Sequence, residues 1–296
     1  MRPAVVAHAA KKLDGGLPEL RRLLAEEGFS DPLWFEVPKV KRAPAAVEAA
    51  LEAGADLILA WGGDGMVRRC VNVLADTEVP LAILPAGTAN LFAGYLGIET
   101  DLRAALRVAL RGDRRRVDLG RFERERFAVM AGAGLDAAMI KDSDKRKDRL
   151  GRAAYLFGGA ANVTAAGFGA RIKVDGTLWY EGAASCILVG NIGQLFGGIE
   201  VFADATPDDG RLDLGVLTAE SPTQIVRAVA RTVVGDTHRS PFVRITQARK
   251  VSVKLDRKVR YELDGGDRKK VKSFKVKVEP GAMTVCVPAA GEGREK

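Results

Sequence analysis

Three glycines surround an aspartate in the stretch Trp61–Gly65, which contains Gly62, Gly63, Asp64 and Gly65. An apolar run, 57–60, precedes it, and apolar residues at helical spacing follow it: Val67, Cys70, Val71 and Leu74. This pattern predicts a turn from a buried strand into a helix. Backbone N–H groups and the helix dipole favour phosphate at such a turn, and glycine lets the backbone approach closely. Asp64 would repel phosphate unless a divalent metal ion lies between them; the other interpretation is a tight turn with a solvated aspartate.

A second turn of small residues, Pro85–Asn90, follows the apolar run 80–84 and contains Gly87, Thr88 and Asn90. Strand-like and helix-like segments alternate throughout the first 117 residues, which predicts a parallel sheet. Ligands of such sheets bind beyond the carboxyl ends of the strands. We therefore expect both turns to line one crevice. Alternatively, Thr88 or Asn90 only caps a helix.

Two acidic turns in the second half of the chain could bind a metal ion or act as a base. Asp208, Asp209 and Asp213 lie around Gly210, at a spacing that suits Mg²⁺ or Ca²⁺ but equally a solvated hairpin turn. Asp264 precedes Gly265 after a strand-like run, which is typical of a type I′ turn. Alternatively, Asp264 is a general base, since phosphoryl transfer to a hydroxyl benefits from a carboxylate that takes the proton.

Domain organisation follows from a change of pattern near residue 117. Beyond it, strand-like runs separated by Gly and Asp turns predict a mostly antiparallel sandwich or barrel, with helices near 147–163 and 222–234. The expected fold class is α/β + β, with an α/β domain over residues 1–117 and a mostly antiparallel domain over residues 118–296.

Composition narrows the function classes. Three isolated cysteines and two histidines argue against disulfide frameworks and histidine-rich metal sites, and fit a reducing cytoplasm. The uncharged run 182–199 holds five glycines, so we interpret it as a buried strand and a glycine-rich loop, not as a membrane span. The net charge of +8 suits a nucleotide or an anionic membrane surface. Nucleic acid is disfavoured, because no aromatic platform or helix-turn-helix accompanies the basic clusters.

Five motifs occur in order along nearly the whole chain. They are Gly62–Gly65, Pro85–Asn90, Gly132–Ala137, Asp208–Asp213 and Asp264–Gly265. Together they resemble the diacylglycerol kinase catalytic-domain family, which includes sphingosine kinases and YegS-like bacterial lipid kinases. The resemblance implies that the first domain binds the nucleotide and that the second is a β-sandwich. It implies ATP- and Mg²⁺-dependent phosphorylation of a lipid hydroxyl, with diacylglycerol favoured, in a cleft between two domains. It also implies a cytoplasmic enzyme that visits the membrane surface for its lipid substrate; a homodimer is one option for its assembly.

The resemblance assigns roles residue by residue. Gly62, Gly63, Asp64 and Gly65 would hold the ATP phosphates, with Asp64 engaging the metal ion or the triphosphate. Gly87, Thr88 and Asn90 would form the second nucleotide loop, and Asp264 would deprotonate the lipid. Asp208, Asp213 and the carbonyl of Arg211 match a structural Mg²⁺ site of bacterial members.

Several positions depart from the family pattern. Met66 replaces a threonine, Arg68 and Arg69 replace an Asn-Glu pair, and Gly266 replaces the glutamate of Asp-Gly-Glu, with Asp267 one place later. The arginines offer positive charge near phosphate. Two alternatives therefore stay open: a catalytically silent nucleotide- or lipid-binding homologue, and an NAD kinase-like enzyme, whose family shares the Gly-Gly-Asp-Gly turn.

Overall fold

The computed structural model describes residues 1–134, 167–195, 199–233 and 237–290. These residues divide into two compact units, Met1–Val117 with the segment from Gly281 on, and Asp118–Pro280. The expected helix at 147–163 lies outside the described residues. The predicted second domain ran to the end of the chain, whereas the structure groups the last strand residues with the first unit, because Val285 pairs with Leu81.

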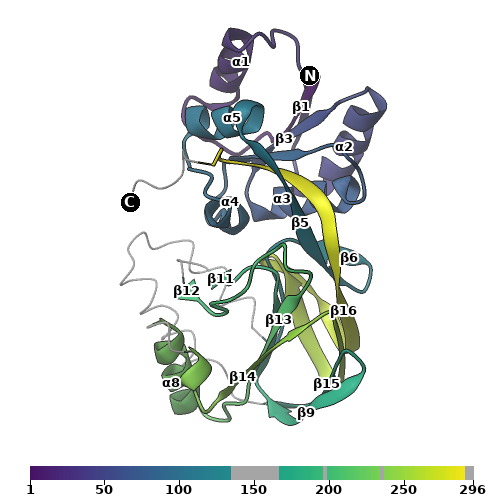
Figure 1. Cartoon of the computed structure of the whole chain (residues 1–296), viewed down its shortest axis with the longest axis vertical. Coiled ribbons are helices and arrows are strands. Elements are labelled where there is room, and N and C mark those ends of the chain that lie inside the picture. The colour runs from purple at the N-terminus through teal and green to yellow at the C-terminus, as the bar shows by residue number, and fades with distance from the viewer. Residues whose placement is uncertain (135–166, 196–198, 234–236, 291–296) are drawn as a thin grey trace. The chain divides into compact units, whose positions relative to one another are not determined.

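The first unit is an α/β fold around a parallel sheet (Figure 1). Its strand order is β4-β3-β1-β2, and the end of β16 adds to β4 in parallel. The strands are β1 (Pro3–His8), β2 (Leu33–Val37), β3 (Leu57–Gly62) and β4 (Leu81–Pro85). The helices are α1 (Gly16–Glu26), η1 (Val40–Arg42), α2 (Ala43–Glu52), α3 (Asp64–Leu74), α4 (Leu91–Tyr95) and α5 (Leu102–Arg111).

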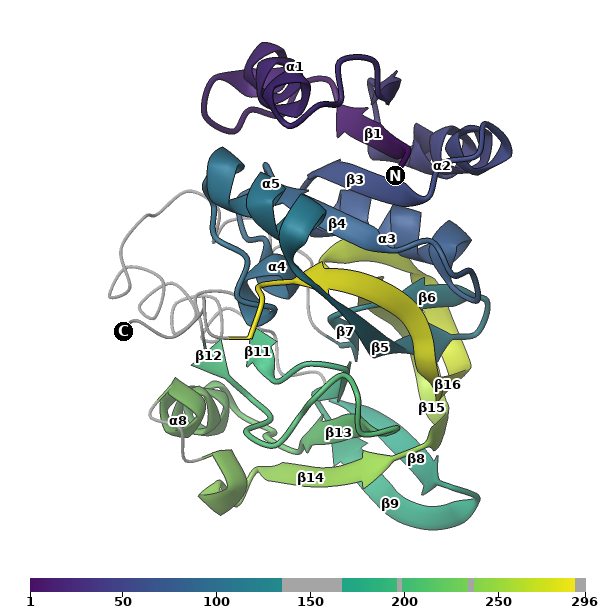
Figure 2. The same ribbon diagram turned by 45° about the horizontal axis from the view of Figure 1, so that its top comes forward.

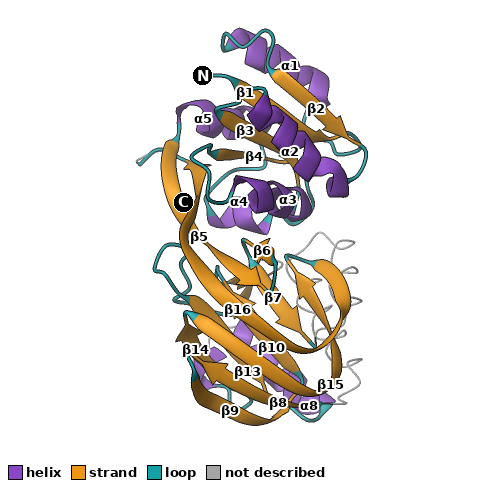
Figure 3. Cartoon of the chain, turned by 90° about the vertical axis from the view of Figure 1, so that its right-hand side faces the viewer, coloured by secondary structure: helices purple, strands orange, loops and turns teal. Residues whose placement is uncertain are grey.

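Burial explains the central strands of this sheet. Every residue of β3 and of β4 is buried, as expected for strands covered on both faces, and α2 packs against α3 (Figure 3). The alternation of strands and helices predicted for the first 117 residues is confirmed.

The second unit is built from antiparallel pairs. Its strands are β6 (Glu125–Phe127), β7 (Met130–Ala133), β8 (Phe168–Val174), β9 (Thr177–Ala184), β10 (Cys186–Gly190), β11 (Gln194–Leu195), β12 (Ile199–Glu200), β13 (Leu212–Leu217), β14 (Val243–Ala248) and β15 (Lys250–Leu263). Two strands, β5 (Asp113–Phe122) and β16 (Gly266–Val287), contribute residues to both units. The helices are α8 (Pro222–Val233) and η4 (Thr237–Arg239).

One hydrophobic core joins the strands of the second unit. It includes Phe127, Ile172, Leu214, Val253 and Phe274, contributed by β6, β8, β13, β15 and β16. The pairing order β14-β13-β10-β7-β15 is antiparallel throughout. The predicted fold class, an α/β domain followed by a mostly antiparallel β-sandwich, is thereby confirmed. None of the helices that the structure describes is both long and apolar enough to cross a membrane.

Candidate functional site

The first glycine loop connects β3 to α3. Gly63 is extended, with φ −100° and ψ −169°, and its carbonyl accepts the amides of Met66 (2.8 Å) and Val67 (3.1 Å). The helix therefore begins at Asp64, directly after the strand. This is the predicted strand-turn-helix, and it presents the amino-terminal N–H groups of α3 at the carboxyl edge of the sheet.

The second loop follows β4 and is shaped by Asn90. This residue adopts a left-handed conformation (φ 48°). Its Nδ2 donates to the carbonyls of Pro85 (3.1 Å) and Gly87 (2.9 Å), and its Oδ1 accepts the Gly87 N–H (3.0 Å). Asparagine tolerates left-handed geometry better than most residues, so one side chain fixes both the turn and its carbonyls. Asn90 thus holds the loop in shape, a role that the sequence pattern alone did not indicate.

The two loops touch through their glycines. A Cβ added at Gly87 would lie 2.3 Å from the Gly63 Cα, so no side chain fits between them. The Ala86 N–H also donates to the Gly62 carbonyl at 3.0 Å. Because β3 and β4 are parallel neighbours, their carboxyl ends meet at one edge. The two turns therefore lie side by side at one edge of the sheet; that they line a crevice stays a prediction.

Asp64 is half-buried and bonded to the second loop. Its carboxylate accepts the Phe92 N–H at 3.1 Å, near the start of α4. Burial raises the pKa of Asp64, while backbone N–H groups of Phe92, Leu91 and Asn90 act in the opposite direction. We interpreted an acid in this loop as needing a metal ion, which stays a prediction; a backbone amide also binds the carboxylate. Asp64 therefore connects the two loops whether or not an ion binds.

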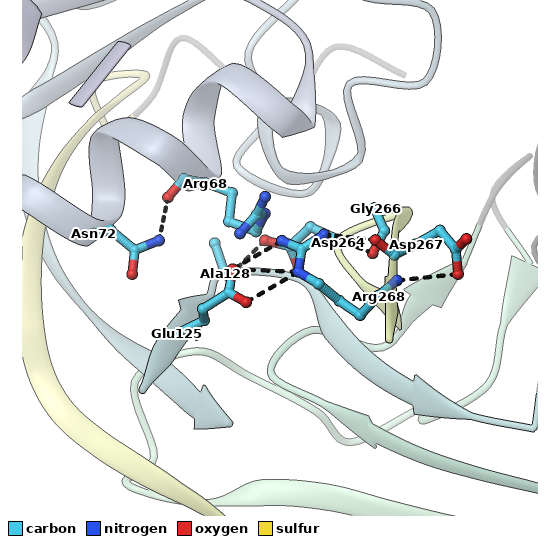
Figure 4. A network of polar contacts seen from close by, with 8 residues as sticks. All are labelled: Arg68, Asn72, Glu125, Ala128, Asp264, Gly266, Asp267 and Arg268. Atoms are coloured by element: carbon cyan, nitrogen blue, oxygen red, sulfur yellow. Dashed lines mark hydrogen bonds and ion pairs between the residues drawn. The ribbon is translucent and has the colours of Figure 1, made fainter. Parts of the chain in front are cut away.

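Three residues that depart from the family pattern, Met66, Arg68 and Arg69, contribute packing as well as positive charge. Met66 is 1% exposed, and a Cβ on Gly62 would lie 2.6 Å from its Cβ, so the methionine fills the core behind the loop. Arg68 is buried, and its carbonyl accepts Asn72 Nδ2 at 2.9 Å (Figure 4). The buried Nε of Arg69 has no hydrogen-bond partner in the described structure. An anion beside α3 would satisfy such a group.

Asp264 lies in the second unit, in the turn between β15 and β16. Asp264 (φ 45°) and Gly265 (φ 74°) both have positive φ, as a type I′ turn requires. The carboxylate is 9% exposed overall and accepts three backbone amides, those of Ala128 (3.0 Å), Val129 (3.0 Å) and Met130 (2.9 Å). Three donors hold the carboxylate in one orientation. These hydrogen bonds therefore hold the turn that carries Asp264 against the segment between β6 and β7.

Three charged residues around Asp264 were not predicted from the sequence. Glu262 shares the Asp264 face of β15 and is 4% exposed, and its Oε2 accepts the Gly265 N–H at 2.9 Å. Burial, and then the charge of Asp264, raise the pKa of Glu262 to about 8. Arg268 forms a two-pronged ion pair with Glu125 (Nε–Oε1 3.0 Å, Nη2–Oε2 2.9 Å) and donates to the Gly266 carbonyl (Figure 4). An acid two residues before Asp264 was the available signal, since alternate strand residues share a face.

Asp267 does not take the place of the missing family glutamate. Its carboxylate pairs with Arg260 at 2.8 Å and accepts the Arg268 N–H at 3.0 Å. It is exposed, whereas Asp264 is buried. The position after Asp264-Gly265 therefore carries no carboxylate of its own.

The acidic turn near Gly210 mixes buried and exposed groups. Asp213 is buried on β13, Asp208 and Asp209 are exposed, and Asp209 accepts the Arg211 N–H at 2.8 Å. Asp118, which was not predicted, is also buried and accepts the Gly210 N–H at 2.7 Å. In the part of the chain that the structure describes, no three His, Cys, Asp or Glu side chains gather as a metal site. Oxygen donors from Asp208, Asp213 and the Arg211 carbonyl suit Mg²⁺ in kind, and the magnesium site stays a prediction.

The remaining motif, Gly132–Ala137, is only partly described. Gly132 and Ala133 lie in β7, paired with Glu262 and Tyr261 of β15, and 135–137 fall outside the described residues. Asp64 belongs to the first unit and Asp264 to the second. Their meeting in a shared cleft therefore stays a prediction.

Comparison with known proteins identifies the family. The diacylglycerol kinase catalytic domain matches residues 8–122, and the YegS C-terminal NAD kinase beta sandwich-like domain matches residues 129–287. The chain belongs to the diacylglycerol kinase family of YegS-like lipid kinases. The resemblance inferred from the five motifs is confirmed.

Relatives of this lipid kinase cover most of its length. A Pseudomonas fluorescens protein named "Probable lipid kinase YegS-like" is 32% identical over 82% of this chain and 81% of its own. The diacylglycerol kinase of Bacillus subtilis is 33% identical over 75% of this chain and 74% of its own.

Solved structures agree on the fold of this lipid kinase. A diacylglycerol kinase from Bacillus anthracis gives a TM-score of 0.77 at 22% identity, covering 97% of this chain and 96% of its own. An NAD kinase from Archaeoglobus fulgidus in complex with ATP gives 0.53 at 14% identity, covering 97% and 93%.

Proposed function

We propose that the protein is an ATP- and Mg²⁺-dependent lipid kinase that phosphorylates a lipid hydroxyl, with diacylglycerol the favoured acceptor. The observation that carries the proposal is the contact between Gly63 and Gly87, where two loops at the ends of β3 and β4 approach without side chains. Backbone N–H groups at the start of α3 suit phosphate oxygens there. The buried Arg69 Nε supports an anionic ligand in the same unit.

The residues divide the chemistry between them. Gly62, Gly63 and Gly65 hold the phosphates of ATP through backbone amides. Gly87, Thr88 and Asn90 form the second nucleotide loop, which Asn90 keeps in shape through its bonds to Gly87. Asp264 accepts the proton of the lipid hydroxyl, whose oxygen then attacks the terminal phosphorus as ADP leaves. Bound Mg²⁺ would neutralise charge on the transferring phosphate. Asp64 is the carboxylate in the glycine loops available to hold it, and Asp208, Arg211 and Asp213 would hold a structural ion.

The amides of Ala128, Val129 and Met130 explain why Asp264 suits the role of base. They hold both carboxylate oxygens in fixed directions, so the proton acceptor is oriented before the substrate arrives. A lipid substrate implies that the protein binds a membrane surface peripherally, on the cytoplasmic side. None of the helices among the described residues could span the membrane. Homodimer formation stays a prediction.

The test is transfer of labelled phosphate from ATP to diacylglycerol in mixed micelles with Mg²⁺, using sphingoid base, ceramide and NAD as alternative acceptors. We expect diacylglycerol to be labelled and Asp264→Asn to lower kcat by at least a hundredfold, because a general base typically contributes about 10²–10⁴-fold. Asp256→Asn, an exposed aspartate of the same unit, is the matched control and should keep wild-type activity. Unchanged transfer in Asp264→Asn would refute the assignment of the base.

A silent homologue is the second candidate. Gly266 stands where the family has a glutamate, and Asp267 is engaged with Arg260. This candidate predicts ATP binding in calorimetry without transfer to any acceptor. Labelling of NAD in preference to lipid would instead favour the NAD kinase-like alternative.

A further inference from the structure

A cationic face covers one side of the strands β9, β8, β15 and β16 in the second unit. Apolar residues of these strands point into the core, and the alternate positions point to solvent. We define the cationic face by six exposed side chains: Arg171, Lys173, Lys250, Lys254, Lys275 and Lys277. The strands are paired, β8 with β9 and β15, and β15 with β16 (Figure 2).

The register places like charges directly opposite one another. Lys250 faces Lys277 across the β15–β16 pair, and Lys254 faces Arg171 across the β15–β8 pair. Such pairs are unfavourable within a sheet. Folding alone therefore does not account for this arrangement, whereas an external anionic partner would.

Carboxylates do not neutralise the cationic face. Glu181 lies 3.6 Å from Arg171, and Glu279 lies 3.3 Å from Lys277 but also binds Arg121 and Arg126. Asp175, in the β8–β9 turn, accepts the backbone amides of Arg249 and Lys250 at the start of β15. Glu123 accepts the backbone N–H of Lys275, and Asp256 is a further exposed acid beside Lys254, so positive charge on the six residues of the face is still in excess.

An exposed leucine distinguishes this face from an ordinary basic surface. Leu178 is 43% exposed and, apart from Met1, is the one large hydrophobic residue of the described chain with that degree of exposure. It pairs with Lys173, so it lies on the cationic side of the edge strand β9. A hollow of about 370 Å³ on the same sheet is lined by Arg171 and Lys254 together with the acids Glu181 and Asp256.

We propose that the cationic face, with Leu178 at its edge, is the surface by which this protein docks on an anionic lipid bilayer. Lysine and arginine attract anionic headgroups from a distance, and an apolar side chain among them enters the boundary between headgroups and acyl chains. The inference rests on the proposed function, because a lipid kinase has to reach a substrate held in a membrane. Nucleic acid would use the charge but has no use for Leu178.

The experiment is co-sedimentation of the full chain with vesicles of phosphatidylglycerol and phosphatidylcholine, compared with pure phosphatidylcholine. Each charge contributes about fivefold to partitioning on an anionic surface, so Lys254→Gln/Lys275→Gln/Lys277→Gln should lower binding by about a hundredfold. The matched control, Lys12→Gln/Lys39→Gln/Lys41→Gln, removes the same charge from exposed lysines of the first unit and should bind as the wild type does.

Salt separates the two contributions. The lysine effect should disappear at high salt, whereas Leu178→Ser should weaken binding by roughly threefold to tenfold at every salt concentration. Equal binding by the face variant and the wild type, or an equal loss in the control variant, would overturn the proposal. The proposal would also be overturned if the protein bound DNA or RNA through the cationic face but did not bind vesicles.

A soluble short-chain diacylglycerol keeps this test independent of the kinase assignment. The face variant should phosphorylate it at the wild-type rate while losing activity on vesicle-bound diacylglycerol. If no acceptor is phosphorylated at all, the proposed function fails, yet vesicle binding and its dependence on the face are still measured.

Discussion

Glycine is needed at positions 87 and 65 for different reasons. Substituting alanine at each position should distinguish a requirement of the fold from a requirement of ligand binding. At Gly87 an added Cβ would lie 2.3 Å from the Gly63 Cα and 2.5 Å from Asn90 Oδ1. At Gly65 nothing lies within 4 Å of an added Cβ. The first glycine is required by the fold, and the second is required only if a ligand approaches the loop.

The cost at Gly87 follows from the geometry. Carbon atoms prefer a separation of about 3.5–4.0 Å, so the two loops must move apart by more than about 1 Å to relieve the 2.3 Å contact. Overpacking typically costs about 1–3 kcal/mol, and loss of the Gly87 N–Asn90 Oδ1 hydrogen bond adds about 0.5–1.5 kcal/mol. We expect Gly87→Ala to lower the free energy of unfolding by about 2–4 kcal/mol and Tm by roughly 4–12 °C.

Gly65→Ala should do the opposite to stability. Gly65 lies in α3 with ordinary helical φ, so alanine should raise the free energy of unfolding by about 0.5–1 kcal/mol. If phosphate approaches the backbone here, the same methyl group should weaken ATP binding by tenfold or more. A more stable protein that binds ATP less well is the expected signature.

Thermal unfolding and ATP calorimetry on both variants give the result. An unchanged Tm in Gly87→Ala would refute the close contact between the loops. Wild-type ATP affinity in Gly65→Ala would refute the phosphate role of the first loop. A loss of stability in Gly65→Ala would show that the residue is packed, contrary to the geometry.

Three further predictions concern the residues that support the two sites. Glu262 has a folded-state pKa of about 8 against 4.5 for the ordinary group, so the folded state binds the extra proton and stability should fall as pH rises from about 4.5 to 8. Glu262→Gln should flatten that decline, as urea unfolding at pH 5.5 and pH 8 would reveal; an unchanged slope would contradict the burial argument. Asn90→Ala removes three hydrogen bonds and should lower the free energy of unfolding by about 2–3 kcal/mol. Asn90→Gly removes the same bonds but adopts the left-handed conformation freely, so it should lower that free energy by less. Equal losses in the two variants would mean that the hydrogen bonds alone matter. Arg268→Met leaves Glu125 and the Gly266 carbonyl without this donor and should lower the free energy of unfolding by about 1–3 kcal/mol. Because Gly266 adjoins the turn that carries Asp264, we also expect a fall in kcat; a fall in Tm with full activity would limit Arg268 to a structural role.

Local patterns determined most elements and both turns. The run 57–60 with the glycines after it predicted the end of β3 and the start of α3, and the positive φ of Asp264 and Gly265 agrees with their turn chemistry. Four strands were missed, β9, β11, β12 and β14. None of the seven residues of β9 before Ala184 is buried, so the strand shows no alternation of burial, as its edge position explains.

Partners distant in sequence were decided by the tertiary structure. Phe92 bonds Asp64 from 28 residues away, and Ala128 bonds Asp264 from 136 residues away. A sequence pattern reports the backbone preference of a segment, but the satisfaction of a buried carboxylate depends on which amides the fold brings to it. That is why the sequence alone did not indicate the backbone amide that binds Asp64 or the burial of Met66 in the core.

The sequence by itself determined that this chain carries the ordered motifs of a lipid kinase on an α/β domain and a β-sandwich. Its periodicities and turn residues are local, and local chemistry suffices to specify strands, helices and glycine loops. Only the tertiary structure decided the contact of Gly63 with Gly87, the burial of Glu262 beside Asp264, and the assembly of six cations on one sheet face. These features depend on strand register and on packing across long sequence separations, which no local pattern encodes.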